Sequence, residues 1–297
     1  MSRQFESCVK KVKIEGRTGN MAKGAVMDGA FFGWDSISIR YGLIDGCGVI
    51  QEETEKLHTH DYDQILWFVS SEPKDMLELG AELEMTLGTN GNRHRITIPT
   101  VVVIPAGTPH FSPLVRGLDR PFYFLSVNCT GELGAQIADE EAVQGVGPWS
   151  EWGGEYNMNV SALHFARKGA YHYGSAMNTD SGGVYAHVNS ASAKIPLSMT
   201  WQTVTKPHTL GPRKNMEFYP HVHADYDETL IFLSLDQGNL TDLHGAAEFS
   251  FGETDEERET FTVTEATAMA LHKGTYHLPL TFTRVDKPMI FISLSNH

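Results

Sequence analysis

The sequence contains little cysteine and no long hydrophobic run. Its 297 residues include three cysteines, Cys8, Cys47 and Cys129, which are widely spaced and form no CxxC pair. This excludes a disulfide framework and a cysteine-based zinc site. No apolar run approaches the ~18 residues of a membrane span, and the N-terminus lacks the apolar core of a secretory signal. We therefore expect a cytoplasmic protein.

Positive charge is also scarce. Lys and Arg number 23 against 37 Asp and Glu, so the formal net charge is −14. A surface of this sign repels phosphate backbones and anionic lipids. We expect neither nucleic acid nor a membrane as a partner. A small-molecule substrate is expected instead, and a homo-oligomer remains open.

Histidine, in contrast, is abundant at 14 residues, and six of these belong to an internal repeat. Each half of the chain has an HxH pair, then Gln or Glu, and later a third His after a glycine-containing turn. The members are His58, His60, Gln64 and His110 in the first half, and His221, His223, Glu228 and His277 in the second. We therefore expect two homologous domains, residues 1–148 and residues 149–297.

Local patterns favour β-strands nearly throughout the chain. Residues 37–41 and 261–264 alternate apolar and polar side chains, and residues 100–104 form a β-branched run, as strands do. Short strands separated by Gly and Pro indicate an all-β sandwich or barrel in each half. One helix is predicted, over residues 132–143 and ended by Gly145.

The spacing of the first set predicts convergence from a single strand. Residues i, i+2 and i+6 lie on the same face of a strand, so His58, His60 and Gln64 would point the same way. After its turn, His110 would return beside them.

In the second set, Glu228 follows His221 by seven residues, which places it on the wrong face of a straight strand. A β-bulge at Ala224 would restore the common face. Without the bulge, Asp227 would face the histidines instead. Alignment of the two repeats, with Ala224 as the extra residue, favours Glu228 and leaves Asp227 as a minor alternative.

Each set offers three neutral imidazoles and one oxygen donor, with positions left open for water or substrate. Such a set suits a divalent transition metal, and it discriminates poorly among Mn, Fe, Ni, Co and Zn. We expect up to one metal ion per domain. The other eight histidines have no ligand-like spacing and are expected in ordinary surface or core roles: His94, His164, His172, His187, His208, His244, His272 and His297.

This order of motifs, HxH, then Gln or Glu four or five residues on, then PxGxxH, resembles the paired motifs of the cupin superfamily, and two copies resemble a bicupin. The resemblance implies two tandem jelly-roll domains (double-stranded β-helices) with few short helices, each holding one divalent metal. The sequence departs from the pattern at Gln64, where Glu is commoner, and at His272, which takes the place of the motif's first Pro. Gln64 makes its site less anionic.

The resemblance also implies a metal-dependent enzyme that acts on a small oxygenated molecule, such as an enediol, a phenol or a carboxylate. Dioxygenase-type or C–C cleaving chemistry is the first expectation, and an oxygen-independent decarboxylase, lyase or isomerase is the alternative. Because Glu228 can take a proton and Gln64 cannot, we expect the C-terminal site to be catalytic. A non-catalytic ligand-binding or sensor bicupin is the competing class, and the lack of a helix-turn-helix pattern and of a basic patch argues against it.

Overall fold

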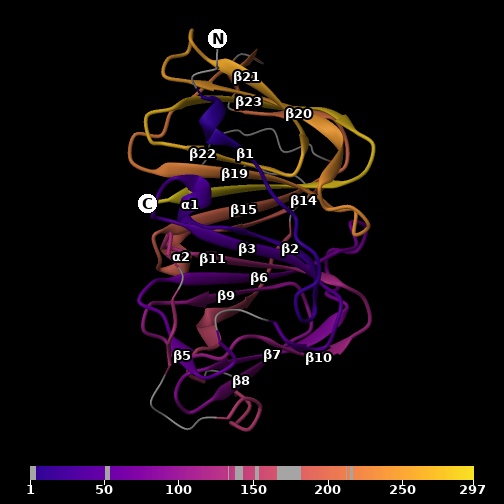
Figure 1. The fold of residues 1–297 in the computed structure, drawn as a ribbon, viewed down its shortest axis with the longest axis vertical. Helices are drawn as coiled ribbons and strands as arrows, with labels where there is room; N and C mark the ends of the chain where they lie inside the picture. Colours follow the sequence, from indigo (N-terminus) through magenta and orange to yellow (C-terminus); the bar gives the residue numbers. More distant parts are fainter. Residues whose placement is uncertain are drawn as a thin grey trace. The chain divides into compact units, whose positions relative to one another are not determined.

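The chain is all-β and forms two compact units (Figure 1). The N-terminal unit is Ile14–Leu163, and the C-terminal unit joins Met1–Lys13 to His164–His297. The computed structural model describes residues 5–50, 54–132, 134–137, 143–150, 154–165, 182–211, 213–214 and 217–297.

The N-terminal unit contains a six-stranded antiparallel sheet in the order β13-β9-β6-β11-β3-β2, a four-stranded sheet in the order β4-β10-β7-β8, and the pair β12-β5. The six-stranded sheet consists of β2 (Met21–Met27), β3 (Ser38–Ile44), β6 (Gln64–Ser70), β9 (Thr100–Ile104), β11 (Phe122–Asn128) and β13 (Val160–Ala162). The smaller sheets consist of β4 (Gly48–Val49), β5 (His58–Thr59), β7 (Ala81–Leu87), β8 (Asn92–Ile96), β10 (Leu114–Leu118) and β12 (Gln136–Ile137).

The C-terminal unit has sheets of the same sizes, ordered β1-β22-β19-β24-β15-β14, β16-β23-β20-β21 and β17-β18. Its six-stranded sheet consists of β1 (Val9–Lys11), β14 (Gly182–Val188), β15 (Leu197–Val204), β19 (Asp227–Ser234), β22 (Thr267–Leu271) and β24 (Met289–Asn296). Its smaller sheets consist of β16 (His208–Leu210), β17 (Arg213–Lys214), β18 (Glu217–Phe218), β20 (Asp242–Gly252), β21 (Glu259–Glu265) and β23 (Tyr276–Val285).

The six- and four-stranded sheets of the two units have matching strand orders, but a different part of the sequence supplies one edge strand of each large sheet. The two-stranded pairs differ, because β5 contains His58 and pairs with β12, whereas β17 and β18 both precede His221. In the N-terminal unit β13 pairs with β9, and in the C-terminal unit β1 pairs with β22. An edge strand leaves backbone groups unpaired, and these short segments pair with them. Residues 1–13 therefore group with the second half and residues 149–163 with the first, so both units end elsewhere than at the predicted division between 148 and 149.

In each unit, buried and exposed side chains alternate along strands, and the buried side chains form a core between the sheets. In β21, Phe261 and Val263 are buried while the threonines on either side are exposed, which is the period-two pattern of a strand with one solvated face. Core residues from both sheets include Phe68, Leu83 and Phe124 in the N-terminal unit and Phe232, Phe249 and Phe282 in the C-terminal unit. Each such side chain stabilises the fold by about 1.5–3 kcal/mol, which holds β6 and β19 firmly in place.

The helix predicted over residues 132–143 is wrong. The described part of this stretch contains β12, in which Gln136 and Ile137 pair with Thr59 and His58, while residues 133 and 138–142 lie outside the described residues. An isolated helix of this length is marginal in water, and pairing with β5 satisfies backbone groups beside the HxH pair instead.

The helices that the structure describes are single turns. They are α1 (Gly29–Phe32), α2 (Ser190–Ala193), and the 3-10 turns η1 (Glu6–Cys8) and η2 (Asn157–Asn159). Within the described ranges, no helix is long and apolar enough to cross a membrane.

Candidate metal centres

The HxH pairs lie in turns and short bridges. His58 belongs to β5, whereas Gln64 is the first residue of β6 in a different sheet. In the C-terminal unit, His221 lies before β19 begins and forms an isolated bridge with His277. The prediction that one continuous strand carries the first three members of each set is therefore wrong. The chain turns between the sheets at this point, so a bulge at Ala224 is not required.

A frame of backbone hydrogen bonds joins the HxH pair to the later histidine. The amides of His58 and His110 each donate to the other's carbonyl, at 3.0 and 2.9 Å, and Gly107 donates to His60 at 2.7 Å. The same bonds recur at 3.0, 2.9 and 2.7 Å among His221, His277, Gly274 and His223. Both glycines have positive φ, +77° and +87°, a conformation that favours glycine. The turn thus brings three imidazoles together in each unit.

In the N-terminal unit the three imidazoles are oriented as metal ligands are. The candidate ligand atoms of His58, His60 and His110 all lie within 4.8 Å of one another, and all three residues are buried. Their Nδ1 atoms donate to the backbone carbonyls of Lys56, Gly134 and Thr108 at 2.7, 2.9 and 2.9 Å. This fixes the tautomer and leaves the lone pair on Nε2. Among the described residues, nothing hydrogen-bonds the buried Nε2 atoms of His60 and His110.

Gln64 supplies a buried amide oxygen at the start of β6. Its Nε2 donates to Asn128 Oδ1 at 2.9 Å and to Ser126 Oγ at 3.1 Å. Its Oε1 is buried and has no hydrogen-bond partner within the described part of the chain. A buried polar atom without a partner costs free energy unless an ion or water satisfies it. A buried amide oxygen without a partner, in the same unit as three clustered imidazoles, fits a divalent cation.

In the C-terminal unit the fourth residue is in direct contact with the histidines. His221 Nε2 lies 3.1 Å from His223 Nε2, and Glu228 Oε2 lies 3.0 Å from His277 Nε2 and 3.8 Å from His223 Nε2. The separations of 3.0 and 3.1 Å match a common metal ion, because two ligand atoms bound at right angles and about 2.1 Å from one metal are about 3.0 Å apart. Ser293 Oγ donates to Glu228 Oε1 at 2.7 Å, so Oε2 is the carboxylate atom that would bind a metal ion together with the histidines.

The alternative ligand Asp227 has a different task. Its Oδ1 accepts a hydrogen bond of 2.8 Å from the backbone amide of Lys273, in the turn before the third histidine. Asp63 makes the same bond, also 2.8 Å, to Ala106 in the N-terminal unit. The structure therefore brings Glu228, and not Asp227, to the histidines.

Burial and charge set the protonation states of the two groups. Burial lowers the pKa of His110 well below its usual value, and the neighbouring His58 lowers it further, so this imidazole is neutral. Burial alone would raise the pKa of Glu228, but His277 and His223 lower it to about 2, so Glu228 is a carboxylate. Burial would lower the pKa of His277, yet the Glu228 carboxylate raises it on balance. In the N-terminal group His110 is thus neutral, and the C-terminal group carries a carboxylate.

The C-terminal group opens into a small cavity. Besides the four candidate ligands, its walls are Leu210, Leu230, Leu278, Leu280, Phe291 and Ser293. The free volume is about 40 Å³, and a buried water needs roughly 10–15 Å³ on the same measure. The cavity therefore accepts only a few atoms, against a largely apolar wall.

Tyrosines stack on the second histidine of each pair, a role that the sequence did not reveal. Tyr62 lies parallel to His60 with ring centroids 4.5 Å apart, and Tyr226 lies on His223 at 4.4 Å. The signal was the repeated Asp-Tyr-Asp after each HxH. Of the eight histidines expected to be background, none joins a metal-ligand cluster among the described residues, and His172 lies outside the described residues.

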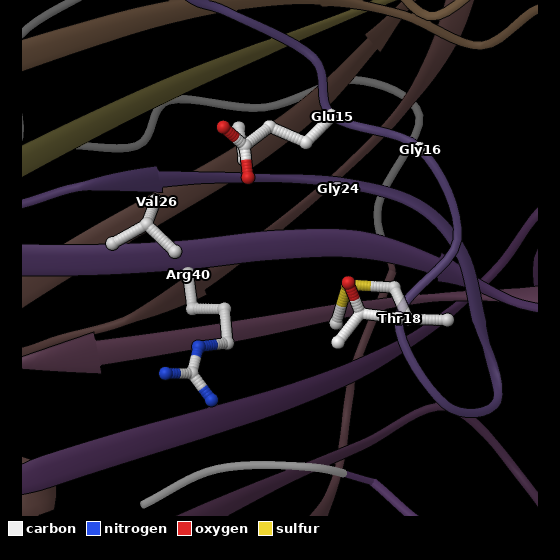
Figure 2. A pocket seen from close by; sticks show the side chains of 8 residues that line it. Glu15, Gly16, Thr18, Gly24, Val26 and Arg40 are labelled. Carbon is white, nitrogen blue, oxygen red and sulfur yellow. The ribbon is translucent and has the colours of Figure 1, made fainter.

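A further cavity of about 290 Å³ lies on the N-terminal unit beside β2 and β3. Figure 2 shows Glu15, Val26 and Arg40 among the side chains that line it. None of the candidate metal ligands lines this cavity, so it takes no part in the metal centres.

No protein-family model matches the chain, and no curated protein matches it. The chain is similar to oxalate decarboxylase from Bacillus subtilis, with a TM-score of 0.61 and 12% identity over 97% of this chain and 75% of that chain. A structure of the same enzyme studied for its Mn(II) centres has a TM-score of 0.60 and 11% identity over 97% and 76% of the two chains. At this identity the likeness concerns the fold, and the chain has the all-β fold of cupin structures.

Proposed function

We propose that the protein is a metal-dependent enzyme acting on a small oxygenated acid, with the C-terminal group as the reaction centre. The observation that carries this proposal is the convergence of His221, His223, His277 and Glu228 on a small cavity with apolar walls. The N-terminal group of His58, His60, His110 and Gln64 would hold a second ion.

The donor sets fit a divalent metal. Three neutral imidazoles with a carboxylate or amide oxygen suit Mn, Fe, Co, Ni or Zn, and Mn is the first to test because the similar oxalate decarboxylase structures include one studied for its Mn(II) centres. When bound, such an ion supplies a Lewis acid that stabilises negative charge on a substrate oxygen.

The residues around the C-terminal group select for size and exclude water. Leu210, Leu230 and Leu278 line the cavity, and a dry, low-dielectric wall strengthens electrostatic interactions inside it. Free volume for a few atoms favours a short carboxylate or an enediol over a phenolic ring. The likeness to oxalate decarboxylase supports oxygen-independent lyase or decarboxylase chemistry ahead of dioxygenase chemistry.

Glu228 is better suited to bind the metal than to act as a base. A general base works best when its pKa lies near the working pH, whereas the pKa of Glu228 is about 2. Ser293 holds its Oε1, so Oε2 remains for the ion. A catalytic role for Glu228 in moving a proton would require this carboxylate to leave the ion first.

The test is a turnover screen of metal-reconstituted protein. Short mono- and dicarboxylates, enediols and phenols are offered to the Mn²⁺-loaded protein, with products followed by mass spectrometry and oxygen by an electrode. We expect turnover of a short acid without oxygen uptake. Replacing His221 and His223 by Ala should abolish it more completely than replacing His58 and His60 by Ala. The opposite ranking would move the reaction to the N-terminal group, and ligand binding without turnover would favour a sensor.

A further inference from the structure

The two candidate centres differ at one matched position. Gln64 begins β6 and is the register partner of Asn128 on β11. Glu228 is the second residue of β19 and aligns with Gln64 in the repeat, and its partner on β24 is Ser295. An amide paired with Asn in one unit thus corresponds to a carboxylate paired with Ser in the other.

The amide of Gln64 is held in one orientation by a buried polar network. Both hydrogens of its Nε2 are used, on Asn128 Oδ1 at 2.9 Å and on Ser126 Oγ at 3.1 Å. Asn128 Nδ2 donates in turn to Ser38 Oγ at 3.3 Å. All four residues are at most 3% exposed. With the nitrogen committed to these acceptors, the oxygen is the atom left for a cation.

In the C-terminal unit the hydrogen bond runs the other way. Ser293, which matches Ser126, donates its hydroxyl proton to Glu228 Oε1 at 2.7 Å. A hydroxyl can donate or accept, so the serine fits either residue. Asn128 as oriented here does not, because its Nδ2 donates to Ser38 Oγ and its Oδ1 would face a carboxylate oxygen if Gln64 were Glu. To donate to a carboxylate, Asn128 would have to turn its amide over. In this orientation Asn128 favours an amide over a carboxylate at this position.

We infer that Asn128 is a positioning residue that turns the Gln64 oxygen toward the three imidazoles and makes the N-terminal group a charge-neutral metal centre. The inference rests on the proposed metal binding. A neutral ligand set leaves the charge of a divalent ion uncompensated in a buried site, which costs free energy. The N-terminal centre therefore binds a divalent ion more weakly than the C-terminal centre, whose Glu228 cancels one charge.

The experiment measures Mn²⁺ affinity at one centre at a time. In full-length protein carrying His221→Ala and His223→Ala, only the N-terminal group remains, and free Mn²⁺ is followed by electron paramagnetic resonance. Asn128→Leu, which keeps the size but removes the acceptor, should weaken binding about tenfold, the lower end of the range for loss of a residue that orients a ligand. Asn128→Asp keeps an acceptor and cannot donate, so affinity should stay the same or rise.

A second pair of variants tests whether Asn128 favours an amide over a carboxylate at position 64. Gln64→Glu alone requires Asn128 to turn its amide over and give up its hydrogen bond to Ser38, whereas Gln64→Glu with Asn128→Ser copies the C-terminal pair and lets Ser126 donate. We expect the double variant to bind Mn²⁺ at least tenfold more tightly than the single variant. The matched control is Ser295→Ala in protein carrying His58→Ala and His60→Ala, where Mn²⁺ affinity should not change.

Two results would overturn the inference. Equal Mn²⁺ affinity with Asn and Leu at position 128, in variants with unchanged thermal unfolding, removes the positioning role and leaves the proposed function intact. Failure of the N-terminal group to bind Mn²⁺ with Gln64 and Asn128 both present removes the neutral centre itself, and turnover at the C-terminal group would then be judged separately.

Discussion

Ser293 offers the sharpest perturbation of the C-terminal centre, because it is not a candidate ligand and contacts the candidate ligand Glu228. Its hydroxyl donates to Glu228 Oε1 at 2.7 Å. A hydrogen bond to a charged group contributes about 1.5–3 kcal/mol, and each 1.4 kcal/mol corresponds to a factor of ten in affinity. Ser293→Ala should therefore weaken metal binding roughly 10–100-fold, the range typical of groups that orient a metal ligand.

The matched variant is Ser126→Ala in the N-terminal unit. There the serine accepts from the neutral amide of Gln64 at 3.1 Å, and a hydrogen bond between neutral groups contributes only about 0.5–1.5 kcal/mol. We expect a loss of less than about tenfold. Each affinity is measured by competition with a chelator, in protein whose other centre has lost both residues of its HxH pair. Equal losses at the two centres, or no loss with Ser293→Ala, would refute the reasoning.

Three further outcomes follow from particular contacts. Leu278→Phe should fill the cavity beside His277 and abolish turnover while metal content, measured by elemental analysis, is retained. In metal-free protein the pKa of Glu228 is lowered from 4.5 to about 2. Its contribution to the free energy of unfolding is therefore present above about pH 4.5 and is lost as the pH falls toward 2. In urea unfolding, the free energy of unfolding should fall less steeply between pH 4.5 and 2 in Glu228→Gln than in the unchanged protein. Glu84→Gln should cost about 1.5–3 kcal/mol in urea unfolding, because the buried Glu84 carboxylate accepts from Arg116 at 2.9 Å, and an unchanged midpoint would contradict this.

The sequence alone identified the histidines of both groups because their signals are short and repeated. An HxH pair and a glycine turn before the third histidine are local patterns, and their recurrence made coincidence improbable. Choosing Glu228 over Asp227 also came from the repeat. The all-β fold followed from alternating strands such as residues 261–264.

Features that depend on pairing between distant segments were not predictable in this way. Counting faces along one strand assumed an extended chain, whereas residues 61–63 turn from one sheet to another. The segment at Gln136 became a strand because β5 pairs with it. Ser126 and Asn128 hold Gln64 from more than sixty residues away, and no local pattern announces such partners.

The metal content of the full-length protein tests the central claim most directly. After reconstitution with Mn²⁺ and removal of loosely bound ion, we expect two ions per chain. Replacing His221 and His223 by Ala should leave one, held by the N-terminal group, and replacing His58 and His60 by Ala should leave the other. Protein that retains no transition metal under any of these conditions would contradict the account.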